Sequence, residues 1–593
     1  MPQQRESSIA FIGGGPRTLG ILERLAKNSG ASSGPLDIHV VEPFEPGSGR
    51  IWRRGQSALL KLNSLAGEVT MFTDSSVRMA GPPAPGPSLA EWAAGIREGR
   101  IRELPDWNPE LADEAASLSP QSFPSRVLHA RYLQWCYAGV LRAMPPEVTV
   151  HWHRCRAEAV EPAAGDRHRV RLSSGFAPLT VDAVVLATGH AEETGTDSGF
   201  AEFAREHGLH YQPPSYTADS DFSRVAPGRE VIVRGMGLAF IDLMVLLMEG
   251  RGGRFEQTSE GLRYRPSGAE PVLLVGSGRG VPYRCKPRPQ LHGSPAAVRY
   301  LTESTVRGLL ETHREVDFEQ HLQPLLLREL AHGYYQELAT GHPHRITVGW
   351  PEFQAAVDRD APADELRKML ADPADLLDFA RLDRPLDGLS DPDRQTQISR
   401  HVAADLRLRT AEGHSESYGL FLALIGCHRA ISAIPQDRFS AASRPAMAGR
   451  WHSFFSYLAS GPPPARLREL LALHEAGLIR FLGAGLRVWP DPGNGRFAAA
   501  GSAGSASAEI LIDAFLPVQP EPVPVDRQAR MLGPDGRPIP GRFAAGPFTS
   551  APKTGAFSRP GSNAPAFREN DALAHRLLAW IGARTPALAE AVH

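Results

Sequence analysis

The feature that most constrains this chain is a glycine-rich turn that separates a short apolar run from a helical pattern. Residues 8–12 read Ser-Ile-Ala-Phe-Ile, typical of a buried parallel strand, and apolar residues at helical spacing follow over residues 19–25. A glycine turn between a strand and a helix binds a dinucleotide pyrophosphate through free backbone N–H groups and the positive end of the helix dipole. The predicted cofactor contacts in this turn are Gly13, Gly14, Gly15, Pro16, Arg17 and Thr18, with Thr18 at the position where the fingerprint has its third glycine.

An acidic residue ends the second predicted strand. Residues 38–42 read Ile-His-Val-Val-Glu, and Glu42 lies 27 residues after Gly15. A carboxylate at this position accepts a hydrogen bond from a ribose 2′-hydroxyl and disfavours a 2′-phosphate. The first site is therefore predicted to take FAD or NAD.

A second strand–turn–helix opening follows later in the chain. Residues 230–237 read Glu-Val-Ile-Val-Arg-Gly-Met-Gly, and Phe240 replaces the third glycine. One interpretation makes Gly235, Gly237 and Phe240 contacts of a second nucleotide. The other makes this an ordinary glycine turn of a βαβ unit.

A basic loop, residues 278–288, follows the next strand of this second unit. The planar guanidinium of Arg279 or Arg284 could bind a 2′-phosphate with two hydrogen bonds, which would favour NADPH over NADH. Either arginine could equally be a solvated surface residue.

Composition excludes several classes of protein. The 593 residues contain 64 Lys and Arg against 66 Asp and Glu, a net charge of −2, which argues against a nucleic-acid-binding protein. No apolar run is long enough to span a membrane, and no signal-peptide pattern opens the chain. The four cysteines are far apart without a CxxC pair, so we expect reduced thiols, a cytoplasmic protein and no zinc site.

These patterns predict an α/β fold with two Rossmann-like dinucleotide-binding domains and a large helical insertion. We expect the Gly-, Ala- and Ser-rich residues 493–507 to form a flexible loop. The predicted segments are an FAD-binding domain at 1–225, an NADPH-binding domain at 226–296, a helical insertion on the substrate side at 297–465, a return to the NADPH-binding domain at 466–508, and the C-terminal part of the FAD-binding domain at 509–593.

The two glycine turns, together with the Ala-Thr-Gly run at residues 187–189, resemble the class B flavin monooxygenases. The likeness spans most of residues 8–295 and 470–580. It implies FAD in the first fold and NADPH in the second. A nicotinamide would thus deliver a hydride to a flavin.

A narrower resemblance rests on other segments. Residues 60–73 and the helical pattern at 126–135 are similar to amine N-hydroxylases, and the helical insertion with the run SGPPPARLREL is similar to bacterial nitrosuccinate synthases. This resemblance implies a monooxygenase that consumes NADPH and O2 and N-hydroxylates a small amine or amino acid through a C4a-hydroperoxyflavin. The specific expectation is the conversion of L-aspartate to nitrosuccinate.

Two alternatives remain open at this point. A flavin oxidase or reductase would use both nucleotides without oxygenating a substrate. A flavin-binding sensor or scaffold protein would use the helical block as a protein interface. A homodimer is a further possibility that the residues leave undecided.

An aspartate substrate has two carboxylates, for which arginine is the natural partner. The predicted substrate ligands are Arg288, Arg444 and Arg450, each with an alternative reading as a surface residue. The predicted catalytic residues are Lys61, Asn63 and His292. The further predicted cofactor contacts are Trp52, Arg126, Thr188, Gly189, Pro547 and Asn563; Pro547 stands where many relatives have aspartate.

Overall fold

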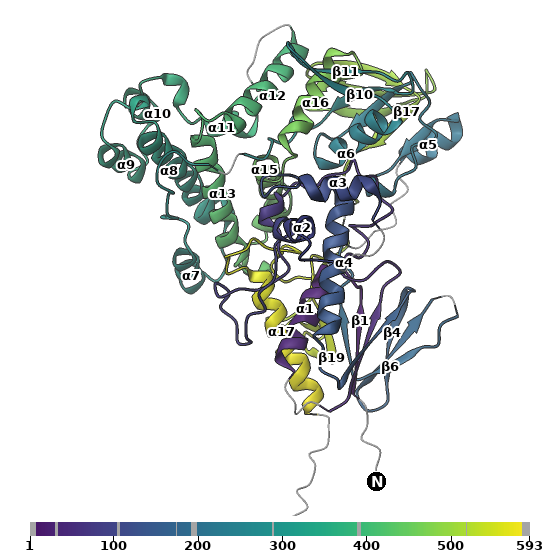
Figure 1. Cartoon of the computed structure of the whole chain (residues 1–593). Helices are drawn as coiled ribbons and strands as arrows, with labels where there is room; N and C mark the ends of the chain where they lie inside the picture. Colours follow the sequence, from purple (N-terminus) through teal and green to yellow (C-terminus); the bar gives the residue numbers. More distant parts are fainter. Residues whose placement is uncertain are drawn as a thin grey trace, which may run out of the picture. The chain divides into compact units, whose positions relative to one another are not determined.

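The computed structural model (Figure 1) describes residues 7–29, 34–102, 107–173, 175–190, 199–287, 290–387, 393–517 and 519–583. The chain divides into two compact units. The first unit combines Met1–Glu192 with Gln519–His593, and the second unit is Glu193–Val518.

The first unit is built on a six-stranded sheet with the order β18-β19-β7-β1-β2-β3. All its strand pairs are parallel except the β18–β19 pair at one edge. The strands are β1 (Ser7–Ile12), β2 (Leu36–Val41), β3 (Val148–His153), β7 (Ala183–Leu186), β18 (Arg530–Leu532) and β19 (Pro538–Ala544).

Both faces of this sheet are covered, which explains why β1 is a continuous apolar run. Ile9 and Phe11 face a helical layer, whereas Ala10 and Ile12 face a three-stranded antiparallel sheet. The helices are α1 (Pro16–Asn28), α2 (Leu89–Arg97), α3 (Pro109–Ser117), α4 (Arg126–Arg142) and α17 (Pro565–Gly582), and the small sheet consists of β4 (Ala157–Ala163), β5 (Arg167–Leu172) and β6 (Leu179–Val181).

The second unit contains a five-stranded parallel sheet with the order β13-β12-β9-β17-β8. Its strands are β8 (His210–Gln212), β9 (Glu230–Arg234), β12 (Val272–Gly276), β13 (Ile479–Gly483) and β17 (Ile510–Asp513). The helices α5 (Gly199–His207) and α6 (Leu238–Leu247) and the hairpin of β10 (Arg254–Thr258) and β11 (Gly261–Arg265) belong to the same unit.

The strand pairing differs from the segments expected from the sequence. Residues 210–212 and 510–513 were expected in the FAD-binding domain, but β8 and β17 pair in register with each other, and β17 pairs with β9. Short apolar strands fit either parallel sheet, and only the pairing decides to which sheet they belong.

The expectation of a flexible loop at residues 493–507 is wrong. Here β15 (Arg496–Gly501) and β16 (Gly504–Ala508) form an antiparallel sheet with β14 (Arg487–Asp491). Phe497 and Ala499 point into the apolar core. Because most side chains in this segment are small, the sequence does not show which of them alternate between core and solvent. Their burial in the structure does.

The described part of residues 297–465 is helical, as expected. Its longest helices, α8 (Gln323–Gly341) and α13 (Glu416–Ser432), pack side by side (Figure 1). A side chain on Gly333 would lie 2.8 Å from the backbone oxygen of Gly419, so the pair of glycines permits this close approach. The other α-helices here are α7 (Glu303–Thr312), α9 (Trp350–Asp358), α10 (Ala363–Lys368), α11 (Phe379–Asp383), α12 (Arg394–Thr410), α14 (Ser443–Ala446), α15 (His452–Ala459) and, ending the block, α16 (Pro464–Glu475).

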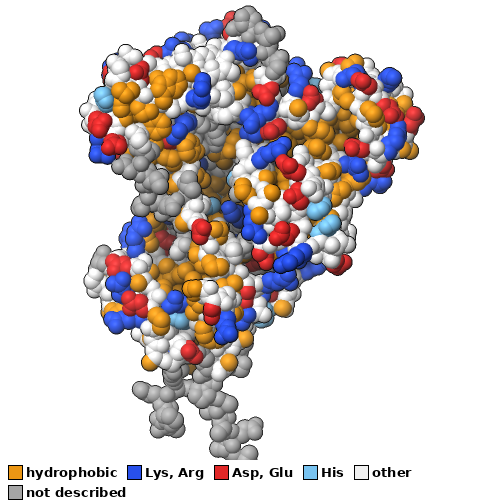
Figure 2. Space-filling model, turned by 180° about the vertical axis from the view of Figure 1, so that it is seen from behind, with side chains coloured by type: hydrophobic (Ala, Val, Ile, Leu, Met, Phe, Trp, Pro, Cys, Tyr) orange, Lys and Arg blue, Asp and Glu red, His pale blue; other side chains and the backbone are white. Residues whose placement is uncertain are grey.

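Charges of both signs are interspersed over the face of the molecule shown in Figure 2. This mixture agrees with the near-zero net charge. Among the described residues, no helix is both long and apolar enough to cross a membrane.

Candidate functional site

The candidate dinucleotide site of the first unit lies at the carboxyl ends of its parallel strands. Gly13 follows β1 with φ +105°, and a side chain there would overlap the carbonyl oxygen of Ala187, just after β7. Thr18, fully buried in α1, donates from Oγ1 to the carbonyl of Gly13 over 2.6 Å. The threonine therefore closes the turn with its side chain, where a third glycine would pack helix against strand.

The N-terminus of α1 fits a pyrophosphate. Gly15 caps the helix without a side-chain hydrogen bond, Pro16 fills the first helical position, and the first turn has no acidic residue. A Cβ added at Gly15 would meet nothing within 4 Å, so this backbone faces open space. Free N–H groups and the helix dipole at such an opening favour an anion.

Glu42 lies beside this opening, as the sequence predicted. Its carboxylate accepts the Gly14 N–H over 2.8 Å and the Phe44 N–H over 3.0 Å. Burial raises the pKa of Glu42, and the two backbone hydrogen bonds oppose that rise. Each carboxylate oxygen retains capacity to accept a ribose hydroxyl.

The Arg17 side chain has a structural partner instead of an open approach to the cofactor. Its guanidinium donates to Asn570 over 2.9 Å and to Thr554 over 2.5 Å, and it pairs with Glu569. Burial lowers the pKa of Arg17, while Glu569 raises it. Arg17 thus attaches α1 to α17, which leaves its backbone N–H as the group available to a phosphate.

Trp52 packs edge-on against His129 of α4, with ring centroids 5.0 Å apart, and Phe557 lies 5.1 Å from the same imidazole. His129 is fully buried, and burial lowers its pKa to about 3. Neither ring nitrogen has a hydrogen-bond partner among the described residues. The sequence singled out Trp52 but gave no signal for His129 or Phe557, because an isolated His or Phe on a helical or loop pattern is unremarkable.

The remaining predicted contacts of this unit occupy neighbouring positions. Gly189, with φ +75°, and Thr188 follow β7, Pro547 lies in the turn after β19, and Arg126 begins α4. Asn563 accepts the Arg78 N–H through its side-chain oxygen over 2.9 Å. Because β7 and β19 run parallel to β1, Gly189, Thr188 and Pro547 lie at the same end of the sheet as Gly13. Their contacts with the cofactor stay predictions.

Lys61 donates from Nζ to Glu114 on α3 over 2.8 Å, and Asn63 lies two residues further along the same segment. Glu114 also accepts the Ser125 N–H over 2.7 Å. The ammonium group is therefore fixed at the wall of a cavity that Glu114 lines.

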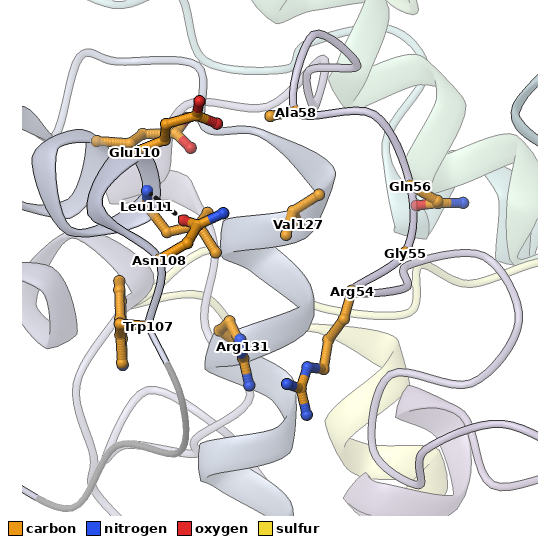
Figure 3. A pocket seen from close by; sticks show the side chains of 11 residues that line it. Arg54, Gly55, Gln56, Ala58, Trp107, Asn108, Glu110, Leu111, Val127 and Arg131 are labelled. Atoms are coloured by element: carbon orange, nitrogen blue, oxygen red, sulfur yellow. Dashed lines mark hydrogen bonds between the residues drawn. The ribbon is translucent and has the colours of Figure 1, made fainter.

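This cavity of the first unit has a volume of about 660 Å³ (Figure 3). Figure 3 shows Arg131 projecting from α4 and Arg54 from the facing loop, with Leu111 on α3 and Trp107 just before that helix. No motif in the sequence marks these four residues. Arg131 is 6% exposed and lies in α4, where the sequence predicted a cofactor contact for Arg126 only.

The second unit repeats the strand–turn–helix geometry. Gly235 follows β9 with φ +119°, and a side chain there would lie 2.8 Å from the carbonyl oxygen of Ala514. Gly237 caps α6 without a side-chain hydrogen bond, and Phe240 is fully buried in the core. The ring of Tyr283 lies against Gly237, 3.2 Å from the position of an added Cβ. The open helix N-terminus fits an anion, with an aromatic ring beside it.

The two arginines expected to clamp a 2′-phosphate have other partners in the structure. Arg279 donates to the carboxylate of Asp383 over 2.6 Å and stacks on Tyr457 at 4.3 Å. Arg284 donates to Asp405 over 2.7 Å. Burial favours these internal ion pairs over a solvated basic loop, and so the geometry gives these arginines structural roles.

Two of the three predicted substrate arginines lie in the described part of the chain, and each has a partner within the protein. Arg288 lies outside the described residues. Arg444 is exposed and donates to the backbone of Phe439, whereas Arg450 is exposed and pairs with Glu319 over 3.2 Å. Arg450 lines a cavity of about 600 Å³ between α8, α11, the π-helical turn Met447–Trp451 and the start of α15. Their substrate contacts remain predictions.

His292 is held by its backbone. Its N–H donates to Glu337 of α8 over 2.6 Å, and its ring packs against His342 with centroids 4.9 Å apart. The side chain lines a small cavity that also contains Arg409. The predicted catalytic histidine therefore shares a cavity with an arginine that nothing in the sequence marks.

A histidine cluster lies at the edge of the first unit's sheet, next to the backbone of Glu42. His39 Nδ1 lies 3.0 Å from His153 Nε2, and the ring of His39 stacks on His151. Burial, followed by the charges of His153 and His151, lowers the pKa of His39 to about 4, while Asp37 raises it. His39 and His153 share a hydrogen bond, whereas His151 pairs with Asp37, and no group of three metal-binding side chains is found among the described residues.

This depressed pKa predicts acid sensitivity. Between pH 6.5 and about 4 the unfolded chain binds a proton at His39 that the folded state excludes, so stability falls as the pH falls. The expected loss is about 2–3 kcal/mol at pH 4. We expect His39→Gln to flatten the slope of Tm against pH over this window, with the exposed His575→Gln as control. An unchanged slope would show that His39 does not titrate in this way.

Comparisons with known proteins agree with this geometry. A family described as FAD-NAD(P)-binding matches residues 10–191. An L-aspartate N-monooxygenase (nitrosuccinate-forming) of Streptomyces davaonensis is 34% identical and aligns over 97% of this chain and 97% of its own length. The protein of the same description from Streptomyces cremeus is 32% identical, covering 98% of this chain and 96% of that protein.

Two further proteins extend the comparison. A nitrosuccinic acid synthase of Aspergillus oryzae is 31% identical over 80% of this chain and 73% of that protein. Among solved structures, the chain is similar to an ornithine N-hydroxylase of Kutzneria sp. 744, with a TM-score of 0.41 and 13% identity, covering 98% of this chain and 100% of that one. The sequence relatives confirm the resemblance inferred from the motifs. The chain therefore belongs to the family of nitrosuccinate-forming L-aspartate N-monooxygenases.

Proposed function

We propose that this protein is an FAD- and NADPH-dependent monooxygenase that oxidises the α-amine of L-aspartate to the nitro group of nitrosuccinate. The observation that carries this proposal is the match along 97% of both chains to a relative with that activity in its name. Two strand–glycine–helix openings of the kind that bind FAD and NADPH support it.

When bound, FAD supplies the redox and oxygen chemistry, and the protein supplies binding and orientation. The N-terminus of α1 would hold the pyrophosphate through its free backbone N–H groups. Glu42 would accept a ribose hydroxyl while it keeps the Gly14 N–H in place. The apolar rings of Trp52 and Phe557 exclude water from their surroundings.

The substrate amine must lose a proton before it can act as a nucleophile. A group that accepts this proton, or a water path to solvent, is therefore required. His292 is our candidate for the task, because it lines a cavity with room for one water molecule, whereas Lys61 is paired with Glu114. We assign Lys61 the role of an electrostatic or positioning group.

The proposal is tested by a visible spectrum and by NADPH oxidation measured with and without L-aspartate, with peroxide and nitrosuccinate quantified. We expect bound flavin, NADPH consumption that L-aspartate stimulates, and nitrosuccinate as product. Peroxide as the sole product, with every amine tested, would instead establish a flavin oxidase. Bound FAD without NADPH turnover would favour a sensor or scaffold.

Lys61→Met is expected to lower kcat/KM for L-aspartate at least ~10-fold, the effect of losing one charge-assisted contact. Glu114 keeps its hydrogen bonds from Ser125, so the fold and flavin content should be unchanged. Steady-state kinetics with flavin content measured in parallel checks this, and Lys61→Arg should retain more activity. Wild-type kinetics in Lys61→Met would remove Lys61 from the site.

A further inference from the structure

The two nucleotide-binding openings of this chain share their backbone geometry, so their residues can be matched position by position. In the first unit, the Gly13 N–H donates to the carbonyl of Val41, the last residue of β2, over 2.9 Å. In the second unit, the Gly235 N–H donates to the carbonyl of Gly276, the last residue of β12, also over 2.9 Å. The residue that follows each of these strands therefore occupies the same place beside its glycine turn.

The matched position carries a carboxylate in the first unit and a hydroxyl in the second. Glu42 follows β2, and Ser277 follows β12. In a Rossmann fold the side chain at this strand end faces the 2′ position of the ribose, where a carboxylate repels a 2′-phosphate. Ser277 has no charge, and a Cβ added at the next residue, Gly278, would meet no atom of the described residues within 4 Å. The end of β12 therefore offers open space without a repelling charge.

An arginine of the helical insertion lies at this strand end. Nη1 of Arg384 donates to the carbonyl oxygen of Gly278 over 3.2 Å, although the two residues are 106 positions apart in the sequence. The Arg384 side chain is 53% exposed, and its Nε lies 3.9 Å from the carboxylate of Asp383. The bond to Gly278 occupies one of the five N–H donors of the guanidinium, so donors remain for a ligand. A planar guanidinium binds phosphate through paired hydrogen bonds.

Arg279 fixes the segment that carries Arg384. Its Nε donates to the carbonyl oxygen of Asp383 over 2.7 Å, and its Nη2 donates to the carboxylate of the same residue over 2.6 Å. Asp383 is the last residue of α11, and Arg384 follows it directly. The aspartate neutralises one of the two arginines, so this group of three residues carries one net positive charge and attracts an anion.

We propose that Arg384 binds the 2′-phosphate of NADPH and that Arg279 positions Arg384 for this contact. The helical insertion thus determines which nicotinamide cofactor the enzyme accepts. The inference rests on the proposed function and deepens it by naming the residue that selects its reductant. It also explains how a 2′-phosphate finds a cation although Arg279 and Arg284 of the basic loop are both paired with carboxylates of the protein.

Binding of the oxidised cofactors to the FAD-loaded enzyme, measured by isothermal titration calorimetry, tests the proposal without turnover. Bound FAD occupies the first site, so NADP+ and NAD+ report on the second. We expect the wild type to bind NADP+ at least ~10-fold more tightly than NAD+, the effect of a charge-assisted contact with the phosphate. Equal affinities for the two cofactors would overturn the 2′-phosphate site.

The variant Arg384→Gln removes the exposed guanidinium. We expect it to raise the Kd for NADP+ at least ~10-fold, with the Kd for NAD+ and the flavin content unchanged. Arg381→Gln is the matched control, because Arg381 is exposed on the same helix and the variant removes the same charge. It should bind both cofactors as the wild type does. An equal loss in both variants, or an unchanged Kd for NADP+ in Arg384→Gln, would overturn the contact with Arg384.

Ser277→Glu gives the second strand end the carboxylate that the first one has. We expect this variant to lose its preference for NADP+ and still to bind NAD+, because the new charge repels the phosphate and can accept the 2′-hydroxyl. A wild-type preference in Ser277→Glu would mean that this strand end does not face the ribose, and the proposal would fail.

Arg279→Gln separates positioning from binding. We expect it to raise the Kd for NADP+ less than Arg384→Gln does, and we expect the double variant to bind NADP+ no more weakly than Arg384→Gln alone. Additive losses would show that Arg279 itself contacts the phosphate, which would overturn its role as a positioning residue. The Kd for NAD+ serves as the measure of any general damage to the domain.

These binding results do not depend on the oxidised product, so the two proposals can fail separately. If the wild type makes no nitrosuccinate, the proposed function fails, but a preference for NADP+ that requires Arg384 would still establish the 2′-phosphate site. If the wild type makes nitrosuccinate and binds NADP+ and NAD+ equally, the proposed reaction stands and the role of Arg384 is overturned.

Discussion

Gly15→Ala is expected to yield a folded protein that binds FAD at least ~10-fold more weakly than the wild type. The added methyl group meets no protein atom within 4 Å, so it occupies only the space at the N-terminus of α1. It would keep a pyrophosphate from the backbone N–H groups, whose charge-assisted hydrogen bonds are each worth about 1.5–3 kcal/mol. The direct cost at a helix N-cap is only about 1 kcal/mol or less.

Gly13→Ala provides the contrasting variant two residues earlier. Its methyl group would overlap the carbonyl of Ala187, and its backbone would be held at φ +105°, which an L-residue rarely adopts. We expect at least ~3 kcal/mol of destabilisation of the apoprotein, from backbone strain and displacement of the strand end.

Flavin titration and apoprotein Tm separate the two effects. Gly15→Ala should change the FAD Kd much more than Tm, whereas Gly13→Ala should lower Tm before any flavin is added. If Gly15→Ala retained wild-type FAD affinity, the pyrophosphate would not lie at the N-terminus of α1. If Gly13→Ala kept wild-type Tm, the close approach of Gly13 to Ala187 would be in error.

Asp405→Asn is expected to be the most damaging single change in the second unit. It leaves Arg284 and Arg409 as buried cations without a carboxylate, and breaking a buried ion pair in this way typically costs about 3–5 kcal/mol. Because the Cys285 N–H also donates to Asp405, the basic loop at residues 278–288 loses an anchor. Loss of Tm and of NADPH-dependent activity should follow together.

The double variant Asp405→Asn/Arg409→Gln is the informative control. Removing one of the two unpaired cations should recover part of the lost stability, so the two changes should be non-additive. Additive losses in Tm would mean that Arg409 and Asp405 are not coupled. A wild-type Tm in Asp405→Asn alone would contradict the charge imbalance itself.

The sequence was informative where local chemistry is specific. A turn with Gly13 and Gly15 between strand and helix has few uses, and Glu42 at the end of the next strand narrows them further. The structure places all three residues at the carboxyl ends of the strands, with Gly13 against Ala187, Glu42 bonded to the Gly14 N–H, and Gly15 facing open space. The helical character of residues 297–465 was equally predictable, because apolar residues recur at helical spacing along its long helices.

Single charged residues were much less predictable. Arg284 reads as a solvated residue or a phosphate ligand, but the structure buries it against Asp405, 121 residues later in the chain. Arg409 has no local pattern to mark it, since only the positions of Arg284 and Asp405 reveal its unbalanced charge. Phe497 and Ala499 likewise show their strand character only through the core they meet.

By itself, the sequence determined the two nucleotide-binding openings, the helical insertion and, by resemblance, the reaction class. Backbone geometry and amphipathic periodicity depend on residues close together in the sequence, so they can be predicted from it. Only the tertiary structure decided which sheet takes β8 and β17, which arginines are neutralised, and which cavity Arg409 and His292 share. Burial and charge balance depend on residues far apart in sequence, and they exist only once the chain has brought those residues together.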